Sequence, residues 1–209
     1  MSSAARPGGV TISAPRVLAR LFLFPLLALL LFGCGFNNIP TAEEAAKAKW
    51  SDVLNQYQRR SDLIPNLVET VKGFAKQESS VLEAVTAARA QATSIKVDAS
   101  TITDPETFKK FQQAQAQLSG SLGRLLAISE SYPELKSNAN FLALQSQLEG
   151  TENRIAVARH DYIEGVRVYN TELKTFPGSV WAAVFYRSNK PMEEFTIADS
   201  AKVAPQVKF

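Results

Sequence analysis

The sequence predicts an all-α protein: an elongated, antiparallel, up-and-down bundle of three long helices plus a short C-terminal helix, preceded by a lipoprotein signal segment. Two observations support this fold class. Apolar residues recur over long stretches at alternating steps of three and four, which is the helical period, and not at the strand period of two. A single uninterrupted apolar run lies near the amino terminus, and it ends at the only cysteine.

Residues 1–33 have the organisation of a secretory leader. Three arginines and no acidic residue precede the apolar run LFLFPLLALLLF, which is followed by Gly33 and Cys34. The sequence LFGC at 31–34 resembles the bacterial lipobox, in which the cysteine thiol receives a lipid. We therefore predict lipid attachment at Cys34 and a polar tether at 34–40. The alternative is an uncleaved anchor, although the run is shorter than the roughly 20 apolar residues of a typical span.

Either kind of anchor leaves the leader arginines inside and the rest of the chain facing the periplasm. In double-membrane bacteria an aspartate after the cysteine retains lipoproteins in the inner membrane. Gly35 stands there, so the lipobox resemblance implies the outer membrane, and an uncleaved leader would imply the inner one. The three leader arginines account for the formal net charge of +3. The remaining chain is neutral and offers no basic patch for nucleic acid.

The first helix is expected from Thr41 to about Ile95. It opens on the sequence TAEE, which has the form of a capping box. Pro65 interrupts its apolar seam, and because proline lacks an N–H and its ring meets the carbonyl four residues back, we expect a kink near Ser61–Ile64. The seam resumes in phase, which favours one bent helix over two. At 1.5 Å per residue this helix would span about 80 Å.

The second helix is expected to follow a loop at 97–103. Asp104-Pro105-Glu106 supplies a cap, a proline at the first helical position and an acid in the first turn. Tyr132-Pro133 ends this helix. The short connections predict that successive helices are antiparallel neighbours.

The third helix begins near Ser137 and ends at Phe176, because Pro177-Gly178 follows. The sequence SVWAAVFY at 179–186 predicts a short helix that covers one end of the bundle. The bundle therefore spans 41–186, and 187–209 is expected to form an extended tail laid on the surface.

Signatures of catalysis and metal binding are missing from the sequence. With one histidine, His160, and one cysteine, the chain cannot supply the usual ligands of a zinc site. It contains no phosphate-binding glycine loop, no G-x-S-x-G and no H-E-x-x-H. We expect no enzymatic activity, no cofactor and no metal.

Polar residues on or beside the apolar seams are the candidate functional residues. At the seam positions of Glu78, Glu152 and Arg159 an unpaired charge would be costly, so we expect each to pair with an opposite charge across the core. Two interpretations stay open: a salt-bridge network that sets helix register, or a shallow polar groove near Pro65. The set comprises Arg60, Asp62, Asn66, Glu69, Glu78, Arg89, Glu152, Arg154, Arg159 and Asn170.

Several of these residues fall within segments similar to the signature of the LemA family. The segments are RRSDLIPNLVETVKGF at 59–74, YPELK at 132–136, LEGTENRIA at 148–156, Tyr169-Asn170 with Phe176-Pro177, KPM at 190–192 and PQVKF at 205–209. The resemblance runs from about residue 37 to the end. It implies a membrane-attached, all-helical bundle and brings no established activity or catalytic residues.

These observations lead to three hypotheses about function. The first is a membrane-anchored, non-enzymatic helical scaffold or protein-interaction module of the bacterial envelope, with an unidentified protein partner. The second is a small-ligand-binding or weakly hydrolytic module that uses the cluster of Arg60, Asp62, Asn66 and Glu69. The third is assembly into homo-oligomers at the membrane surface through an exposed apolar stripe.

Overall fold

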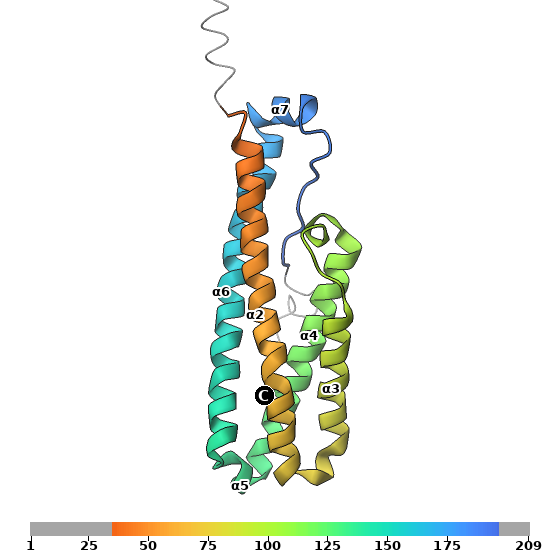
Figure 1. Ribbon diagram of the computed structural model, residues 1–209, viewed down its shortest axis with the longest axis vertical. Coiled ribbons are helices and arrows are strands. Elements are labelled where there is room, and N and C mark those ends of the chain that lie inside the picture. The colour runs from red at the N-terminus through yellow and green to blue at the C-terminus, as the bar shows by residue number, and fades with distance from the viewer. Residues whose placement is uncertain (1–34, 197–209) are drawn as a thin grey trace, which may run out of the picture.

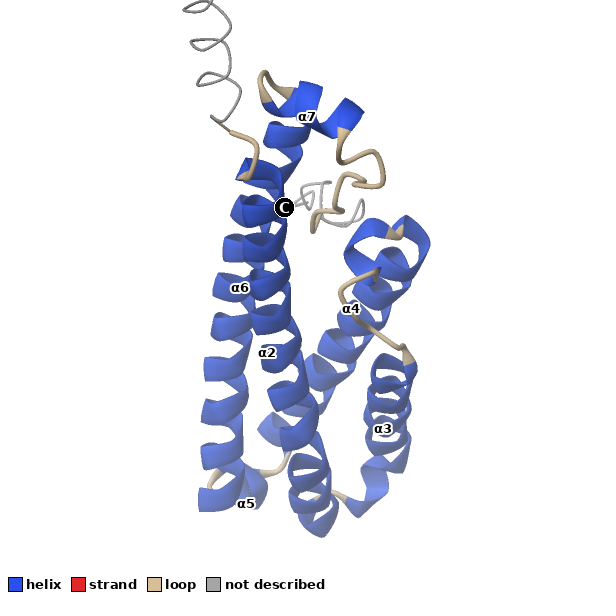
Figure 2. Cartoon of the chain, turned by 45° about the horizontal axis from the view of Figure 1, so that its top comes forward, coloured by secondary structure: helices blue, strands red, loops and turns tan. Residues whose placement is uncertain are grey.

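The computed structural model describes residues 35–196, which form an all-helical bundle without strands (Figures 1 and 2). The predicted fold class is confirmed. The leader, Cys34 and residues 197–209 lie outside the described part of the chain. No helix within residues 35–196 is both long and apolar enough to cross a bilayer. The α-helices are α2 (Asn38–Phe74), α3 (Ser79–Ser94), α4 (Pro105–Ile128), α5 (Pro133–Lys136), α6 (Ala139–Lys174) and α7 (Gly178–Val184), and short 3-10 turns lie at Lys76–Glu78, Thr101–Thr103 and Ser129–Ser131.

The single first helix predicted for residues 41–95 is wrong, because the chain reverses direction within it. The helix α2 continues through Pro65 without a break and ends at Phe74, and α3 returns from Ser79 alongside it. Ala75, with φ −121° and ψ 56°, leaves the helical region at the turn. The apolar spacing is the same on both sides of the turn, so it could not reveal the reversal. Folding back lets the two segments bury their apolar faces against each other.

The start of the first helix also differs from the prediction, whereas α6 begins near Ser137 as predicted. Helix α2 begins at Asn38, so Thr41 lies inside it and is not its cap. The cap of α6 is Asn138, whose Oδ1 accepts from the backbone N–H groups of Asn140 and Phe141 at 3.0 and 3.1 Å. The predicted start of α4 is confirmed, since Asp104 caps the helix ahead of Pro105. A side-chain acceptor at this position satisfies an N–H that lacks a partner within the helix.

The long helices form two antiparallel pairs. Helix α2 packs along α6 and helix α3 along α4, and α2 also contacts α3, whereas α4 and α6 share few contacts. The α4–α6 side of the bundle is therefore open. The described part of the C-terminal tail, 187–196, descends from α7 into this open side (Figure 1).

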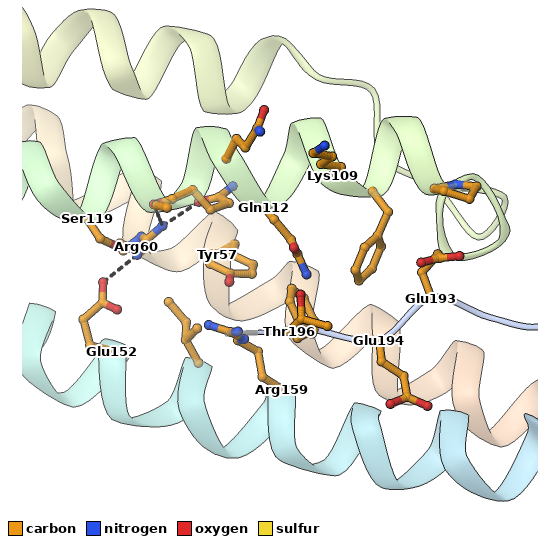
Figure 3. Close-up of a pocket in the computed structure, with 17 residues that line it drawn as sticks. Tyr57, Arg60, Lys109, Gln112, Ser119, Glu152, Arg159, Glu193, Glu194 and Thr196 are labelled. Atoms are coloured by element: carbon orange, nitrogen blue, oxygen red, sulfur yellow. Dashed lines mark hydrogen bonds and ion pairs between the residues drawn. The ribbon is translucent and has the colours of Figure 1, made fainter. Parts of the chain in front are cut away.

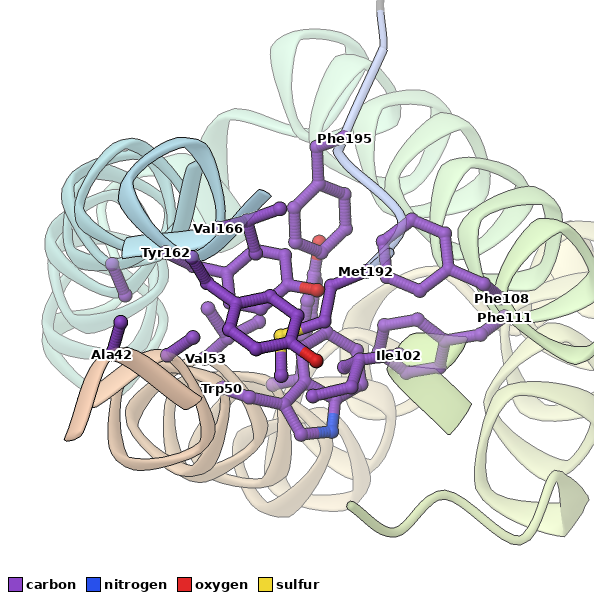
Figure 4. Packing of buried hydrophobic residues seen from close by; sticks show 14 of the residues in the cluster. Ala42, Trp50, Val53, Ile102, Phe108, Phe111, Tyr162, Val166, Met192 and Phe195 are labelled. Carbon is purple, nitrogen blue, oxygen red and sulfur yellow. The ribbon is translucent and has the colours of Figure 1, made fainter. Parts of the chain in front are cut away.

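The expectation that the tail lies on the surface is wrong for its described part, because Met192 and Phe195 are buried. The Phe195 ring packs against Trp50, Phe108 and Tyr162, with centroids 5.1 to 6.0 Å apart (Figure 4). Two apolar residues in a short tail form no periodic sequence pattern that would predict their burial. They are buried because the tail lies between α4 and α6.

The interior consists of two apolar clusters stacked along the bundle axis. The cluster nearer α7 is rich in aromatic residues, such as Trp50 and Phe108, and the other is mostly aliphatic. Along α2 the first cluster ends at Tyr57 and the second begins at Ile64. The buried residues in between, Arg60 and Ser61, are polar, and they position the candidate site.

Candidate functional site

A buried polar layer separates the two apolar clusters. It contains Arg60 and Ser61 of α2, Gln115 of α4 and Thr151 of α6, all of them buried. Because buried polar groups are costly unless they are paired, the partners of this layer decide which helices can lie next to one another and in which register.

Arg60 is the centre of the layer, and only 1% of it is exposed. Its Nη1 donates to Glu152 Oε1 and to Ser119 Oγ, both at 2.7 Å, and its Nη2 donates to Gln115 Oε1 at 2.5 Å (Figure 3). The guanidinium carbon lies 5.0 Å from the centroid of the Tyr57 ring. One side chain of α2 is thus bonded to both α4 and α6. The predicted cross-core pairing of Glu152 is present, with Arg60 as its partner.

The open α4–α6 side forms a groove with a cavity volume of about 680 Å³. Helix α4 lines one wall, α6 the other, and Tyr57 and Arg60 of α2 lie at its base (Figure 3). Two buried donors that line the groove, Arg60 Nε and Gln112 Nε2, have no hydrogen-bond partner among the described residues. We call this feature the α4–α6 groove; its polar lining includes Lys109, Gln112, Gln115, Ser119, Glu152 and Arg159.

The tail closes one end of the groove. Arg159 places its guanidinium carbon 4.4 Å from the centroid of the Phe195 ring, a cation–π geometry. The cross-core ion pair predicted for Arg159 is therefore replaced by an aromatic contact. Burial raises the pKa of Tyr57 at the base of the groove, and the positive charges of Arg159 and Arg60 oppose that rise.

The Asn170 side chain holds the tail by hydrogen bonds to the tail's backbone. Its Nδ2 donates to Met192 O at 3.0 Å, and its Oδ1 accepts from Met192 N at 2.9 Å. Two tyrosine hydroxyls of α6 add to this, with Tyr162 donating to Glu193 O at 2.7 Å and Tyr169 to Lys190 O at 3.1 Å. The tail is thus fixed by hydrogen bonds from one face of α6.

The hydrogen bond of Arg89 is explained by the proline in α2. Its Nε donates to the backbone oxygen of Ser61 at 2.9 Å. In a helix this oxygen would accept from the N–H of residue 65, which is proline and has none. Arg89 therefore supplies the donor that Pro65 lacks, and it ties α3 to α2 at this point.

The remaining candidates do not converge on one site. Asp62 accepts from Gln58 at 2.7 Å, and Asn66 and Glu69 are exposed, with Glu69 3.6 Å from Lys72. The cluster proposed as a ligand site is therefore dispersed: Arg60 points inward and the other three point outward. Glu78 accepts from the Tyr132 hydroxyl at 3.2 Å instead of pairing with a cation, and the exposed Arg154 donates to Thr151 Oγ1 at 3.1 Å.

Sequence reasoning identified Arg60, Glu152 and Arg159 of the groove lining and missed the rest, among them Tyr57, Gln112, Ser119 and Phe195. Tyr57 falls at an apolar seam position of α2, and Gln112, Ser119 and Phe195 lie on elements whose neighbours the sequence does not reveal. Gln115 falls between Phe111 and Leu118 in the three–four apolar spacing of α4, and a glutamine at such a position was the available signal. Among residues 35–196, no group of three or more His, Cys, Asp or Glu side chains is placed to hold a metal ion.

Comparison with known proteins identifies relatives of the whole described bundle. Magnetosome proteins MamQ 2 and MamQ 1 of Paramagnetospirillum magneticum are each 26% identical to the chain, over 97% of its length and 80% of theirs. Magnetosome protein MamQ of Magnetospirillum gryphiswaldense is 25% identical, over 82% of this chain and 70% of its own. The sequence profile of the LemA family matches residues 49–209, which include the polar layer and both walls of the groove. The chain belongs to the LemA family.

Proposed function

We propose that the chain is a membrane-anchored, non-enzymatic scaffold of the bacterial envelope that binds a protein partner through the α4–α6 groove. The observation that carries this proposal is the open side of the bundle between α4 and α6. Tyrosine, phenylalanine and arginine side chains line it together with charges of both signs. Aromatic residues and arginine are the residue types enriched at protein interfaces.

The similar proteins support a non-catalytic role. Their names refer to the magnetosome and not to a reaction. A scaffold also suits the rigid layer beneath the groove, because Arg60 joins α2, α4 and α6. A preformed groove loses little conformational freedom when it binds.

Site-specific photocrosslinking in intact cells tests the groove. A photoreactive amino acid at Gln113, which is exposed and lines the groove, should form an adduct with one protein of defined mass. The matched control is Val157, which is exposed on α6 but does not line the groove. The substitution Lys109→Glu, which reverses an exposed charge in the lining, should remove the adduct from the Gln113 position.

Identical adduct patterns at Gln113 and Val157, or no adduct at either, would contradict the proposal. An adduct made with a second copy of the chain would favour the homo-oligomer. The anchor is tested separately by mass spectrometry of the amino-terminal peptide from membranes. A lipid-modified Cys34 identifies a lipoprotein, an intact leader identifies a spanning anchor, and an unmodified mature chain in the soluble fraction refutes both.

A further inference from the structure

The end of the bundle at α7 exposes a cluster of large apolar side chains. Nine large hydrophobic residues are exposed within residues 35–196, and five of them lie here. Phe176 is 85% exposed and Phe185 is 61% exposed. Contiguous exposed apolar surface on a soluble domain marks an interaction site. We call this cluster the apolar cap; its members are Phe36, Phe176, Val180, Val184 and Phe185.

The apolar cap is a built surface. Trp181 of α7 is buried, and its ring lies 5.6 Å from that of Phe36 in an edge contact. Helix α7 lies tightly against the end of α6, since a Cβ on Gly178 would come within 2.1 Å of the backbone oxygen of Glu172. Val180 and Val184 are one helical turn apart, so with Trp181 turned inward they form the outer face of α7.

Exposed cations outnumber acids around the apolar cap, where the partly buried Glu172 lies against Gly178. From Lys174 to Lys190 the chain contains no acidic residue, and its charged residues are Lys174, Arg187 and Lys190, all exposed. The first turn of α2, which lies beside α7, also contains no acid. An apolar surface bordered by cations is the pattern by which proteins bind to membranes that contain anionic lipid.

A membrane anchor that precedes Gly35 would enter the bundle at the apolar cap. The described chain begins at Gly35, where a Cβ would lie 3.2 Å from the Pro177 side chain, and Phe36 is itself a member of the cap. Cys34 directly precedes Gly35 in the sequence. Figures 1 and 2 show the start of α2 and α7 at the same end of the bundle. A lipid on Cys34 or a spanning leader would therefore bring the cap to the bilayer surface.

We propose that the apolar cap lies in the headgroup region of the bilayer that holds the amino terminus and makes the bundle project from the membrane. This rests on the membrane anchor of the proposed function. Interfacial burial of the cap removes its phenylalanines from water, and the three cations then face anionic headgroups. Arg60 lies about 33 Å along α2 from Asn38, at 1.5 Å per residue. The groove is thereby held clear of the lipid and within reach of a partner.

Tryptophan fluorescence tests the contact directly. The chain has two tryptophans, with Trp181 packed beneath the cap and Trp50 in the aromatic cluster. The full-length chain is reconstituted into vesicles of phosphatidylcholine and phosphatidylglycerol, with or without bromine on the upper acyl chain. The wild-type chain should lose the Trp181 share of its emission in brominated vesicles. The variant Trp181→Phe, which retains Trp50, should be quenched little.

Substitutions on the cap and away from it separate contact from anchoring. The double variant Phe176→Asp/Phe185→Asp alters two exposed side chains and should abolish the quenching while the protein still floats with the vesicles. The matched control, Val157→Asp/Val168→Asp, places two acids at exposed apolar positions of α6 and should leave the quenching unchanged. Circular dichroism of each variant confirms that it is folded.

Each alternative result has a distinct meaning. Wild-type protein that floats with vesicles but shows no quenching of Trp181 overturns the cap proposal and leaves the anchor intact. Wild-type protein that does not float overturns both. If the wild-type protein is not quenched but forms a dimer, and the Phe176→Asp/Phe185→Asp variant does not dimerise, the cap binds a second copy of the chain and the membrane proposal is wrong.

Discussion

The link between Arg89 and the proline of α2 gives the most specific prediction about stability. Pro65 cannot donate to the Ser61 oxygen, and Arg89 Nε donates to it at 2.9 Å instead. Ser61 is buried, so water cannot take over this role without opening the contact between α2 and α3. We predict that Arg89→Met, which keeps an apolar stem, lowers the free energy of unfolding by about 2 kcal/mol, the cost of a lost charged hydrogen bond to a buried acceptor.

The substitution Pro65→Ala changes the outcome because it restores the missing donor. Alanine is favoured over proline inside a helix by about 3 kcal/mol, of which roughly 0.4–1 kcal/mol is returned through the greater freedom of the unfolded chain. The single variant should therefore be about 2 kcal/mol more stable. In the Pro65→Ala background, Arg89→Met should cost less than about 1 kcal/mol, because the Ser61 oxygen then accepts from the alanine N–H.

Urea denaturation followed by circular dichroism measures all four members of this double-mutant cycle. We expect a coupling of about 1–2 kcal/mol between positions 65 and 89. Arg124→Met, a change of the same size at an exposed arginine of α4, is the control and should stay within about 0.5 kcal/mol of the wild type. Equal costs of Arg89→Met in the two backgrounds would refute the idea that Arg89 replaces the donor.

Three further predictions concern the polar layer, the tail and the buried tyrosines. In a urea titration, Glu152→Ala should destabilise the fold by about 2 kcal/mol, because Arg60 then stays buried without a counter-charge, although the Glu152 side chain is itself 46% exposed. The control Glu69→Ala, which removes one partner of an exposed ion pair, should cost under about 0.5 kcal/mol. Asn170→Ala removes two hydrogen bonds to Met192, so it should lower the free energy of unfolding by about 2 kcal/mol. It should also speed amide hydrogen exchange at Met192, measured by mass spectrometry. Unchanged exchange would show that other contacts hold the tail. Burial raises the pKa of three tyrosine hydroxyls above its value in the unfolded chain, so their contribution to stability is complete below about pH 10 and falls as the pH rises beyond it. Ultraviolet absorbance should therefore show these tyrosines ionising only as the helices melt. Ionisation in the folded state would contradict this. The three are Tyr57, Tyr162 and Tyr169.

Much of the fold follows from local features of the sequence. The three–four spacing of apolar residues is the same whichever neighbour a helix packs against, so it identified the helical segments, although it joined α2 and α3 into one. The start of α4 followed from Asp104 and Pro105, because a cap requires only the next few backbone N–H groups. The short helix α7 and the extended chain after it were also predicted from composition and from Pro177.

The candidate site was only partly predictable. Arg60 and Glu152 stood out as charges near an apolar seam, and a partner across the core was predicted for Glu152. That they would find each other, with Ser119 and Gln115 completing the set, depended on which helices become neighbours. The reversal near Ala75 decided that question, and the spacing of apolar residues carries no sign of it, because two helices joined by a tight turn show the same period as one.

The sequence by itself thus determined the helical segments, their apolar faces and the family resemblance, and it predicts lipid attachment at Cys34, because each depends on residues close together in the chain. The tertiary structure decided the pairing of α2 with α6 and of α3 with α4, the open groove between α4 and α6, and the burial of Phe195 within it. These features depend on contacts between residues that are distant in sequence. Such contacts form only where shape, charge and unsatisfied hydrogen-bonding groups on separate elements match.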